Sequence, residues 1–461
     1  MGAGIGGSTA AYFLREELGS SVQMDIFEVK EVGGRTQIWQ DGDEVYEMGA
    51  SIIHEQNRYF RELADKMGLE RVQLGSDGDQ VSIWDGHSFV FNQSSWTLVN
   101  LYRMVRRYGL SYFYMRSAPS EMLKRYKRLY DIQAEGRAFD TPEELLGAVD
   151  LYNLTQQTFR DVLLEEIGLG PAAERFAGEF VAGINRIQYN QGNGINALAG
   201  MVSLLPTIDS RLFHIKGGNR LLAERLINAT GANLLLGRRV TAVHKGAQGG
   251  FQVHSRRADA PKEEGEWHSY DAVLLAGPLE LANIGIGGFE HKKPPLREFQ
   301  QTVTTLVQGR LRPSYFGVRE LPTGEFIMVT ENSTAPFSSI APQRELPSGL
   351  KVYKLFSRQP LWSGTLQEIF QNLTVLEDRS WLAYPHFSPP ERFQPFKLTE
   401  GLYLNNAWEN AASAMEMSAV AAKNCALLIA QHLSKSHACS SRGPSVSGTS
   451  GAAESIGASE E

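Results

Sequence analysis

The chain opens on a run of glycines, from Gly2 to Gly7, that matches the pattern G-x-G-x-x-G. A helical pattern follows, closed by Gly19, and then an alternating strand over residues 22–27. This strand leads into Glu28, about 20 residues after the glycines, where dinucleotide-binding folds place the acid that binds the ribose. Phosphate groups bind at the N-terminus of such a helix because its free N–H groups and its dipole favour negative charge. The pattern therefore predicts a dinucleotide site with contacts at Gly2, Gly4, Gly6, Gly7 and Glu28.

Only Met1 precedes the glycine run, although a buried parallel strand normally comes before it. That strand would lie at the centre of the sheet, with a neighbour on each side. We therefore expect a parallel sheet that is interrupted at its centre. We also expect the natural sequence to begin further upstream, because of a truncation or a start placed too late, with any signal peptide in that part.

The composition argues against several other classes of protein. The 461 residues are 42% hydrophobic, which is enough for two interleaved domains, but they hold no apolar run long enough for a membrane span. The net charge of −7 gives nucleic-acid binding no general electrostatic support. With two cysteines and no H-E-x-x-H, G-x-S-x-G or Walker motif, we expect no disulfide framework and no metal site. The Ser-, Gly-, Ala- and Glu-rich composition of residues 434–461 predicts a disordered tail.

A second cluster of small residues identifies the dinucleotide as FAD. Gly33, Gly34 and Arg35 follow Glu28 closely and are suited to fold over the pyrophosphate, with Arg35 near its oxygens. A further run of small residues lets the backbone lie against a flat ring system. NAD enzymes do not need these additions, whereas FAD proteins of the glutathione-reductase type use them. We therefore predict FAD contacts at Gly34, Arg35, Gly49, Ala50 and Ser51.

Two later segments complete the predicted FAD-binding domain. Strands and a Gly-rich hairpin over residues 234–254 bring in Val240, whose backbone is expected to face the adenine. A strand over residues 401–404 leads through Glu409 into a helix expected from Ser413 to about Leu433. The N-terminus of this helix is suited to stabilise negative charge on a reduced flavin. We therefore predict cofactor contacts at Glu409, Ser413, Ala414 and Met415.

Together these segments predict an α/β fold, in which a glutathione-reductase-type Rossmann domain binds FAD and an α+β substrate domain is interleaved with it. The FAD-binding domain is expected to comprise residues 1–56, 207–281 and 395–433, and the substrate domain residues 57–206 and 282–394. Residues 96–108 form an aromatic, basic helix candidate in the substrate domain. This helix either makes a peripheral contact with a membrane or packs its aromatic side in the core with its arginines in water, and the second interpretation is favoured.

Several stretches resemble the prenylcysteine oxidase family, also called prenylcysteine lyase or, in plants, farnesylcysteine lyase. The similarity covers about Gly2 to Leu433, and its flavin motifs are shared with amine oxidases. The family pattern differs at Asn190 and Gly192, two positions expected near the substrate cavity. The similar stretches are residues 2–8, 32–35, 49–54, 103–110, 303–307, 381–386 and 411–419, of which Tyr384-Pro385-His386 and Ala411-Ala412-Ser413-Ala414-Met415-Glu416 are the most particular to this family.

The resemblance implies an FAD-dependent oxidase that cleaves the thioether of farnesyl- or geranylgeranyl-cysteine in the breakdown of prenylated proteins. A hydride would pass from the prenyl C1 to the flavin, and water would attack the resulting cation to give a prenyl aldehyde and cysteine. Molecular oxygen would reoxidise the flavin and form hydrogen peroxide. His54 is a candidate to guide the water or relay a proton, or else a packing residue, and Glu409 is a second catalytic candidate.

Two other functions remain open. One is a flavin amine oxidase or desaturase relative, and the other is a non-catalytic prenyl carrier, because GDP-dissociation inhibitors and Rab escort proteins share this general fold. The retained Gly33-Gly34-Arg35 and Ser413-Ala414-Met415 segments argue against the carrier. The resemblance also implies a lysosomal, vacuolar or membrane-associated location. The secretory route is favoured by five glycosylation sequons, which begin at Asn92, Asn153, Asn228, Asn332 and Asn372.

Overall fold

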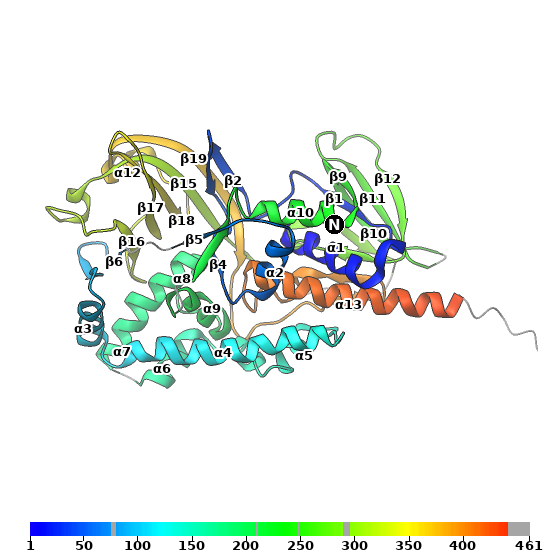
Figure 1. The fold of residues 1–461 in the computed structure, drawn as a ribbon, viewed down its shortest axis with the longest axis horizontal. Helices are drawn as coiled ribbons and strands as arrows, with labels where there is room; N and C mark the ends of the chain where they lie inside the picture. The colour runs from blue at the N-terminus through cyan, green and yellow to red at the C-terminus, as the bar shows by residue number, and fades with distance from the viewer. Residues whose placement is uncertain (75–79, 169, 209–210, 248, 289–295, 441–461) are drawn as a thin grey trace, which may run out of the picture.

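The structure of the chain, a computed structural model, describes residues 1–74, 80–168, 170–208, 211–247, 249–288 and 296–440. Two lobes lie side by side along the long axis of the molecule (Figure 1). The first lobe contains helices α1, α10 and α13, and the second contains a large twisted sheet with helices packed beneath it. Among the described helices, none has both the length and the apolar character needed to cross a membrane.

The first lobe is a Rossmann-type unit assembled from three separate stretches of the chain. Helix α1 packs against both α10 and α13, next to short strands that pair in parallel, β1 with β9 and β13 with β21, while β20 runs antiparallel to β21. The predicted helix that ends at Gly19 is confirmed as α1. The bounds are Ile5–Leu18 for α1, Asp25–Glu28 for β1, Arg220–Thr230 for α10, Asn233–Leu236 for β9, Val273–Leu275 for β13, Lys397–Thr399 for β20, Leu402–Leu404 for β21 and Met415–Ser440 for α13.

The parallel strands of this lobe form two separate sheets, β1–β9 and β13–β21–β20, as the sequence predicts. The first residues of the chain join them. The Met1 ammonium group donates to the Leu274 carbonyl (2.8 Å), and the Met1 carbonyl accepts from the Ala276 N–H (2.8 Å). On the other side, the Gly2 N–H donates to the Phe27 carbonyl (2.8 Å). Backbone hydrogen bonds from Met1 and Gly2 therefore occupy the position between the two sheets.

A four-stranded sheet lies beside the Rossmann unit. The predicted hairpin is confirmed, since β10 and β11 run antiparallel on either side of the Gly-rich turn. The ladder is irregular between Val240 and Ala242, so Thr241 forms a bulge. The strand order is β12–β11–β10–β14, with bounds Arg238–Lys245 for β10, Phe251–Arg257 for β11, Glu266–Tyr270 for β12 and Gly285–Gly287 for β14, and the short helix α11 (Leu279–Ala282) precedes β14.

The second lobe contains a seven-stranded sheet in the order β19–β15–β18–β17–β16–β6–β7. Strand β15, which lies between β19 and β18, is buried on both faces over residues 302–307, because helices or strands cover both sides. The bounds are Val81–Trp84 for β6, Phe89–Asn92 for β7, Phe299–Leu311 for β15, Phe326–Val329 for β16, Ser339–Glu345 for β17, Lys351–Ser357 for β18 and Phe370–Pro385 for β19, with helix α12 at Ser363–Ile369.

Helices form the layer beneath this sheet (Figure 1). The long helix α4 packs against α9 and α3, and α3 begins one residue after the expected start of the aromatic, basic helix. The bounds are Thr97–Tyr108 for α3, Ser111–Ala134 for α4, Pro142–Gly147 for α5, Phe159–Ile167 for α6, Pro171–Arg175 for α7, Ala182–Tyr189 for α8 and Ala197–Ile208 for α9.

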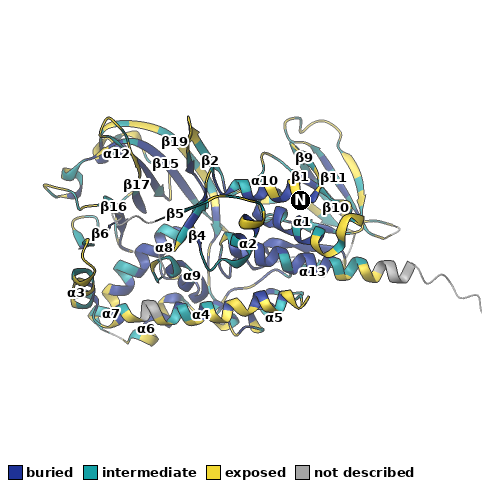
Figure 2. Cartoon of the chain, in the orientation of Figure 1, coloured by how far each residue is buried: buried dark blue, intermediate teal, exposed yellow. Residues whose placement is uncertain are grey.

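Short elements connect the two lobes. Strand β5, from the expected substrate segment, pairs with β8, from the expected FAD-binding segment, and β4 pairs with β8 on its other side. The two lobes also share one hydrophobic core, which runs from Phe13 on α1 to Phe176 near α7 (Figure 2). The predicted domain boundaries therefore stay predictions. The bounds are Ile38–Asp41 for β2, Glu44–Glu47 for β3, Ile53–His54 for β4, Arg58–Lys66 for α2, Arg71–Leu74 for β5 and Leu212–Ile215 for β8.

Two expectations need correction. The predicted end of the last helix at about Leu433 is wrong, because α13 continues to Ser440, and the disordered tail predicted from residue 434 is therefore wrong for its first part. Residues 434–440 contain neither glycine nor proline, so no residue in this stretch breaks the helix. The rest of the expected tail, residues 441–461, lies outside the described residues. The second correction concerns the aromatic, basic helix. Tyr108 is buried and Arg103 and Arg106 are exposed, as expected, but Trp96 and Tyr102 are 72% and 64% exposed and do not pack in the core.

Candidate functional site

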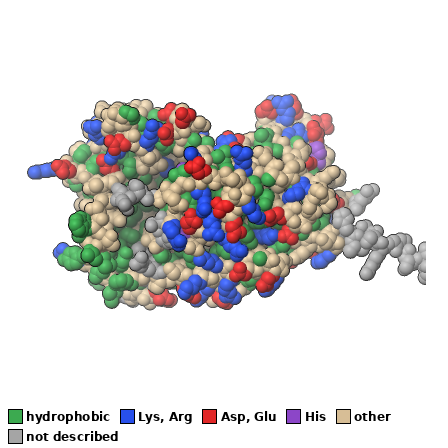
Figure 3. Space-filling view, viewed as in Figure 1, with side chains coloured by type: hydrophobic (Ala, Val, Ile, Leu, Met, Phe, Trp, Pro, Cys, Tyr) green, Lys and Arg blue, Asp and Glu red, His purple; other side chains and the backbone are tan. Residues whose placement is uncertain are grey.

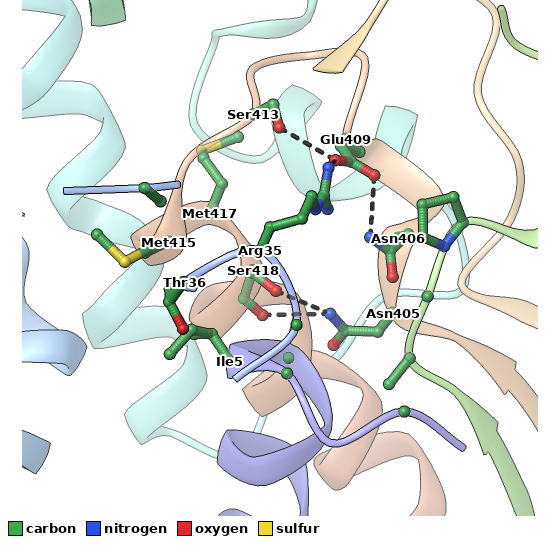
Figure 4. A pocket seen from close by; sticks show the side chains of 18 of the residues that line it. Ile5, Arg35, Thr36, Asn405, Asn406, Glu409, Ser413, Met415, Met417 and Ser418 are labelled. Atoms are coloured by element: carbon green, nitrogen blue, oxygen red, sulfur yellow. Dashed lines mark hydrogen bonds and ion pairs between the residues drawn. The ribbon is translucent and has the colours of Figure 1, made fainter. Parts of the chain in front are cut away.

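A cavity of about 330 Å³ lies where the N-termini of α1 and α13 approach each other (Figure 4). Its wall combines backbone from the glycine-rich loop with side chains from β19 and from the turn before α13. It brings together most of the sequence-predicted residues, namely Gly2, Gly4, Gly6, Glu28, Gly34, Arg35, Ala50, Glu409, Ser413, Ala414 and Met415. Gly7, Gly49, Ser51, His54 and Val240 do not line this cavity.

The glycine-rich loop has no room for side chains at two positions. A Cβ atom on Gly7 would lie 1.9 Å from the Gly2 carbonyl oxygen, and one on Gly6 would lie 2.3 Å from Nδ2 of Asn405. Gly2 itself has φ of +103°, which disfavours other residues. Gly7 therefore allows the loop to close on itself. Gly6 allows the start of α1 to contact the turn after β21, so that the helix N-terminus faces the cavity.

The carboxylate of Glu28 is held in place by backbone on both sides. Its Oε2 accepts from the Ala3 N–H and its Oε1 from the Lys30 N–H, both at 2.9 Å. Glu28 also lines a second cavity of about 300 Å³, whose wall includes Val240. The two cavities share Gly2, Glu28, Ala276, Gly277 and Leu281. They therefore form one elongated site that bends around the glycine-rich loop, a shape suited to a dinucleotide.

Arg35 reaches across the cavity to Glu409 (Figure 4). Gly33 and Gly34, with φ of +113° and +59°, form the turn that carries it there. The Nη1 group of Arg35 donates to a carboxylate oxygen of Glu409 and to the Ala383 carbonyl (2.7 Å). The sequence predicts Arg35 near phosphate oxygens, and that contact stays a prediction. The structure shows the arginine paired with a carboxylate.

Glu409 is an ionised carboxylate inside the protein. It is 6% exposed and accepts hydrogen bonds from Ser413 Oγ (3.0 Å) and from Asn406 Nδ2 (2.9 Å). Burial alone would raise the pKa of Glu409, but the positive charges of Arg35 and Arg297 outweigh it and hold the pKa below its usual value. The turn before α13 therefore carries an ionised carboxylate at the cavity wall, and Arg35 neutralises its charge.

The N-terminus of α13 faces the same cavity. The helix begins at Met415, so Ser413 and Ala414 belong to the turn before it and not to its first turn. The side chains of Met415 and Met417 both lie at the cavity in Figure 4. Because the first N–H groups of a helix lack partners within it, this end is suited to negative charge on a bound group.

The segment from Gly49 to His54 runs behind the cavity wall. A Cβ atom on Gly49 would lie 2.0 Å from the Arg35 carbonyl oxygen, so this glycine permits close packing of two backbone segments. The carbonyls of Ala50 and Ser51 accept from Asn219 Nδ2, each at 3.1 Å. His54 is buried on β4, and its Nδ1 accepts from the Gln56 N–H (3.0 Å). This hydrogen bond stabilises the turn after β4, and His54 does not line the cavity. A catalytic role for His54 therefore stays a prediction.

The sequence reasoning missed two asparagines in the cavity wall. Asn405 Nδ2 donates to Ser418 Oγ (3.2 Å), and Asn406 Nδ2 donates to Glu409, so both amides are fixed in orientation (Figure 4). Within the part of the chain that the structure describes, the Oδ1 atoms of both residues are buried and accept no hydrogen bond. Buried acceptors are rarely left without a donor. The signal was a polar pair at the carboxyl end of strand β21, where ligands bind in α/β folds.

An aromatic group forms another part of the wall that was not predicted as a site. Trp381 and Tyr384 of β19 line the cavity, with ring centroids 6.0 Å apart. Behind them, Tyr189 contacts Tyr384 edge-to-face at 5.3 Å and Phe387 at 5.0 Å. Burial raises the pKa of Tyr384 to about 12, so its hydroxyl stays protonated.

The residue after Tyr189 shows that one expected cavity position is part of the core. Asn190 is 2% exposed, and its amide Nδ2 donates to the Ser357 carbonyl (3.1 Å) while Ser338 Oγ donates to its Oδ1 (2.6 Å). It has φ of +58° at the end of α8, a left-handed conformation that asparagine tolerates. Asn190 therefore fixes the backbone behind the aromatic group.

Comparisons with known proteins agree with this geometry. A sequence model described as prenylcysteine lyase matches residues 91–441, and one described as an NAD(P)-binding Rossmann-like domain matches residues 1–67. Prenylcysteine oxidase 1 of Homo sapiens is 35% identical over 453 residues, which cover 93% of this chain and 87% of that protein. Prenylcysteine oxidase 1-like of Bos taurus is 33% identical over 446 residues, covering 93% and 89%.

Solved structures share the fold at low sequence identity. Cyclohexylamine oxidase from Brevibacterium oxydans IH-35A matches 94% of this chain and 98% of its own with a TM-score of 0.58 at 16% identity. A double mutant of putrescine oxidase matches the same shares with a TM-score of 0.55 at 15% identity. The predicted fold class, a Rossmann-type dinucleotide-binding lobe with a second interleaved lobe, is confirmed.

Proposed function

The chain belongs to the prenylcysteine lyase family, and from this premise we propose that it is an FAD-dependent oxidase that cleaves the thioether of prenylcysteines. The substrates are farnesyl- or geranylgeranyl-cysteine with molecular oxygen, and the products are a prenyl aldehyde, cysteine and hydrogen peroxide. The observation that carries the proposal is the elongated cavity between α1 and α13, with aromatic residues of the family-specific stretch at Tyr384 in its wall.

The residues of the site fit FAD. Side chains are excluded at Gly6 and Gly7, so backbone can cradle a pyrophosphate at the start of α1. The orphan acceptors Asn405 Oδ1 and Asn406 Oδ1 offer buried partners for hydroxyl or ring N–H donors of a flavin. When bound, FAD supplies a hydride acceptor for oxidation of the carbon next to sulfur.

Different residues would hold the two halves of the cofactor. Glu28 is oriented by two backbone N–H groups and is suited to bind the ribose hydroxyls, with Val240 beside the adenine. At the other end, the N-terminus of α13 lines the cavity and would stabilise negative charge on a bound flavin ring. Arg35 and Glu409 both line the cavity and form an ion pair, so together they add no net charge to the site.

The aromatic group supports the choice of substrate. Oxidation next to sulfur develops positive charge on the substrate, which the rings of Trp381 and Tyr384 in the cavity wall are suited to stabilise. The same rings offer apolar surface to an isoprenoid chain. Each buried CH₂ contributes about 0.8 kcal/mol, so an isoprenoid gains far more affinity than a short alkyl group. The protein's own task is to orient the thioether and admit one water, which requires no strong protein base.

Anaerobic reduction of the flavin tests the proposal. Farnesylcysteine with a free amino group is expected to bleach the flavin absorption, and admission of oxygen to restore it with one peroxide formed per aldehyde. Short S-alkyl cysteines are expected to react poorly. Faster reduction by a simple primary amine would establish an amine oxidase instead. Tight binding of prenylated peptides without any reduction would establish a carrier.

We also propose that the protein enters the secretory route, with a lysosomal or vacuolar destination. The support is the accessibility of its sequons, because the asparagine side chains at four of the five are exposed, while the fifth, Asn92, is half-buried. The exposed ones are Asn153, Asn228, Asn332 and Asn372. Treatment of protein from a eukaryotic secretory host with an N-glycosidase is expected to increase its electrophoretic mobility. An unchanged mobility would contradict the glycosylation part of the proposal.

A further inference from the structure

The most exposed cluster of apolar side chains lies on α3 and at the start of α4. It comprises six residues between positions 96 and 113, and we call it the α3 patch. Hydrophobic side chains gather at the end of the molecule where Figure 1 shows α3 (Figure 3). The residues and their exposed fractions are Trp96 72%, Leu98 79%, Leu101 40%, Tyr102 64%, Leu110 77% and Phe113 51%.

The helix α3 is amphipathic in a way that leaves its apolar side in solvent. Leu98, Leu101 and Tyr102, spaced three and four residues apart, share one face. Met104 and Tyr108, one turn apart on the adjoining face, are buried against the protein, and Leu101 lies at the edge between the two faces. Single exposed apolar residues are normal on a protein surface, but a contiguous group marks an interaction site. The α3 patch therefore has a partner in the functional state.

The charges around the patch indicate what that partner is. The segment 86–120 contains no aspartate or glutamate, although the whole chain has a net charge of −7. Arg103 and Arg106 on α3 are exposed, and Arg106 lies one turn after Tyr102. A basic edge beside an apolar face matches a layer with anionic headgroups over acyl chains. Trp96 and Tyr102 are the side chains that favour the boundary between the two.

The shape of the patch favours lipid over a protein partner. Leu98 and Leu110 are nearly 80% exposed, so they project from the surface and do not line a groove. An acyl layer accepts projecting side chains anywhere, whereas a protein would need a pocket for each one. We propose that the α3 patch docks the enzyme on an anionic lipid bilayer, with α3 lying in the plane of the headgroups. The docking itself is independent of the proposed function. Only the idea that the docked enzyme takes a prenylated substrate from the bilayer rests on the proposed function.

Vesicle binding without substrate tests this docking, so its outcome is independent of the reaction. The full-length flavin-loaded protein is mixed with vesicles of phosphatidylcholine alone or with added phosphatidylserine, and the bound fraction is measured by flotation. Wild type is expected to bind the anionic vesicles more strongly. The variant Trp96→Ser with Leu98→Ser is expected to lose about tenfold or more in partition on both vesicles. Arg106→Glu is expected to lose about tenfold on the anionic vesicles only.

Matched controls separate the patch from general surface effects. Trp362 is 73% exposed, as Trp96 is, but lies before α12, and Trp362→Ser is expected to bind as wild type does. Arg225 is exposed on α10, and Arg225→Glu changes the net charge by the same amount as Arg106→Glu. Losses in the controls equal to those in the patch variants would overturn the proposal, as would the absence of vesicle binding by wild type. A patch variant that altered only the oligomeric state would identify a protein interface instead.

Discussion

Replacement of Arg35 by methionine tests whether this arginine serves Glu409 or a phosphate. Loss of one partner from a buried ion pair costs about 3–5 kcal/mol, because the other charge is left without compensation. Arg35 is 34% exposed, however, and Arg297 still lowers the pKa of Glu409. Ser413 and Asn406 also continue to donate hydrogen bonds to the carboxylate. We therefore expect a smaller loss of about 2–3 kcal/mol in the unfolding free energy of the cofactor-free protein.

A double-mutant cycle measures this interaction directly. The unfolding free energies of Arg35→Met, Glu409→Gln and the double variant are compared with wild type by chemical denaturation, and a coupling of about 1–3 kcal/mol is expected. Arg160→Met is the control, because Arg160 pairs with Glu174 (2.7 Å), both side chains are 47% exposed, and such surface pairs contribute at most about 1 kcal/mol. A variant Arg35→Met with unchanged stability but weakened FAD binding would refute the reasoning and assign Arg35 to the phosphates.

The same pair gives a pH dependence with a definite sign. The folded-state pKa of Glu409 is lowered, so its stabilising contribution is present above the pKa of an unfolded glutamate and is lost as the pH falls through the folded-state pKa. In Arg35→Met the folded-state pKa is expected to rise. The loss of stability on acidification should therefore be smaller in the variant than in wild type, as measured by denaturation across the acidic range.

Three further outcomes are expected. Glu28→Ala should weaken FAD binding by about 1.5–3 kcal/mol, or about 10- to 150-fold in Kd, whereas Glu31→Ala should not, and equal affinities in a fluorescence titration would contradict this. Gly7→Ala should prevent FAD retention because its Cβ would overlap the loop's own backbone, whereas Gly147→Ala, with nothing within 4 Å, should purify with flavin. Burial raises the pKa of Glu416 to about 6 in the folded protein. Between about pH 6 and the usual pKa range of glutamate, the folded state of wild type therefore binds a proton on Glu416 that the unfolded state does not. The stability of wild type relative to Glu416→Gln should therefore increase as the pH falls through this window, and a constant difference in unfolding free energy would refute the assignment.

The features that were predictable from sequence depend on residues close together in the chain. The turn, the helix α1, the strand β1 and Glu28 follow from a local pattern in which backbone geometry and spacing fix the result. The hairpin β10–β11 and the strand β21 before α13 were also local, since turn residues and alternation mark them. Elements of this kind need little tertiary context, and their bounds differed from the expectation by only a few residues.

The pairing at the centre of the site was not predictable, because its partners are far apart in sequence. Arg35 and Glu409 are both polar residues after a turn, and each alone suggested a contact with the cofactor. Their pairing depends on how β19 and the turn before α13 are carried to the glycine loop by two interleaved lobes. The unpartnered Oδ1 atoms of Asn405 and Asn406 were not predictable for the same reason. Whether a buried acceptor finds a donor depends on which distant segments of the chain pack around it.

The helix α3 shows why periodicity alone assigned the wrong surroundings to aromatic residues. Its pattern identified an amphipathic helix correctly, but the pattern of one helix cannot say which of two apolar sides the protein covers. Met104 and Tyr108 are buried and anchor α3 to the protein core. Trp96 and Tyr102 do not contribute to this packing and leave apolar surface exposed to solvent. A soluble fold gains nothing from such surface, because each exposed ring keeps its unfavourable contact with water. Trp96 and Tyr102 are apolar side chains that the packing of α3 does not require. They are therefore the residues that support docking on a lipid layer.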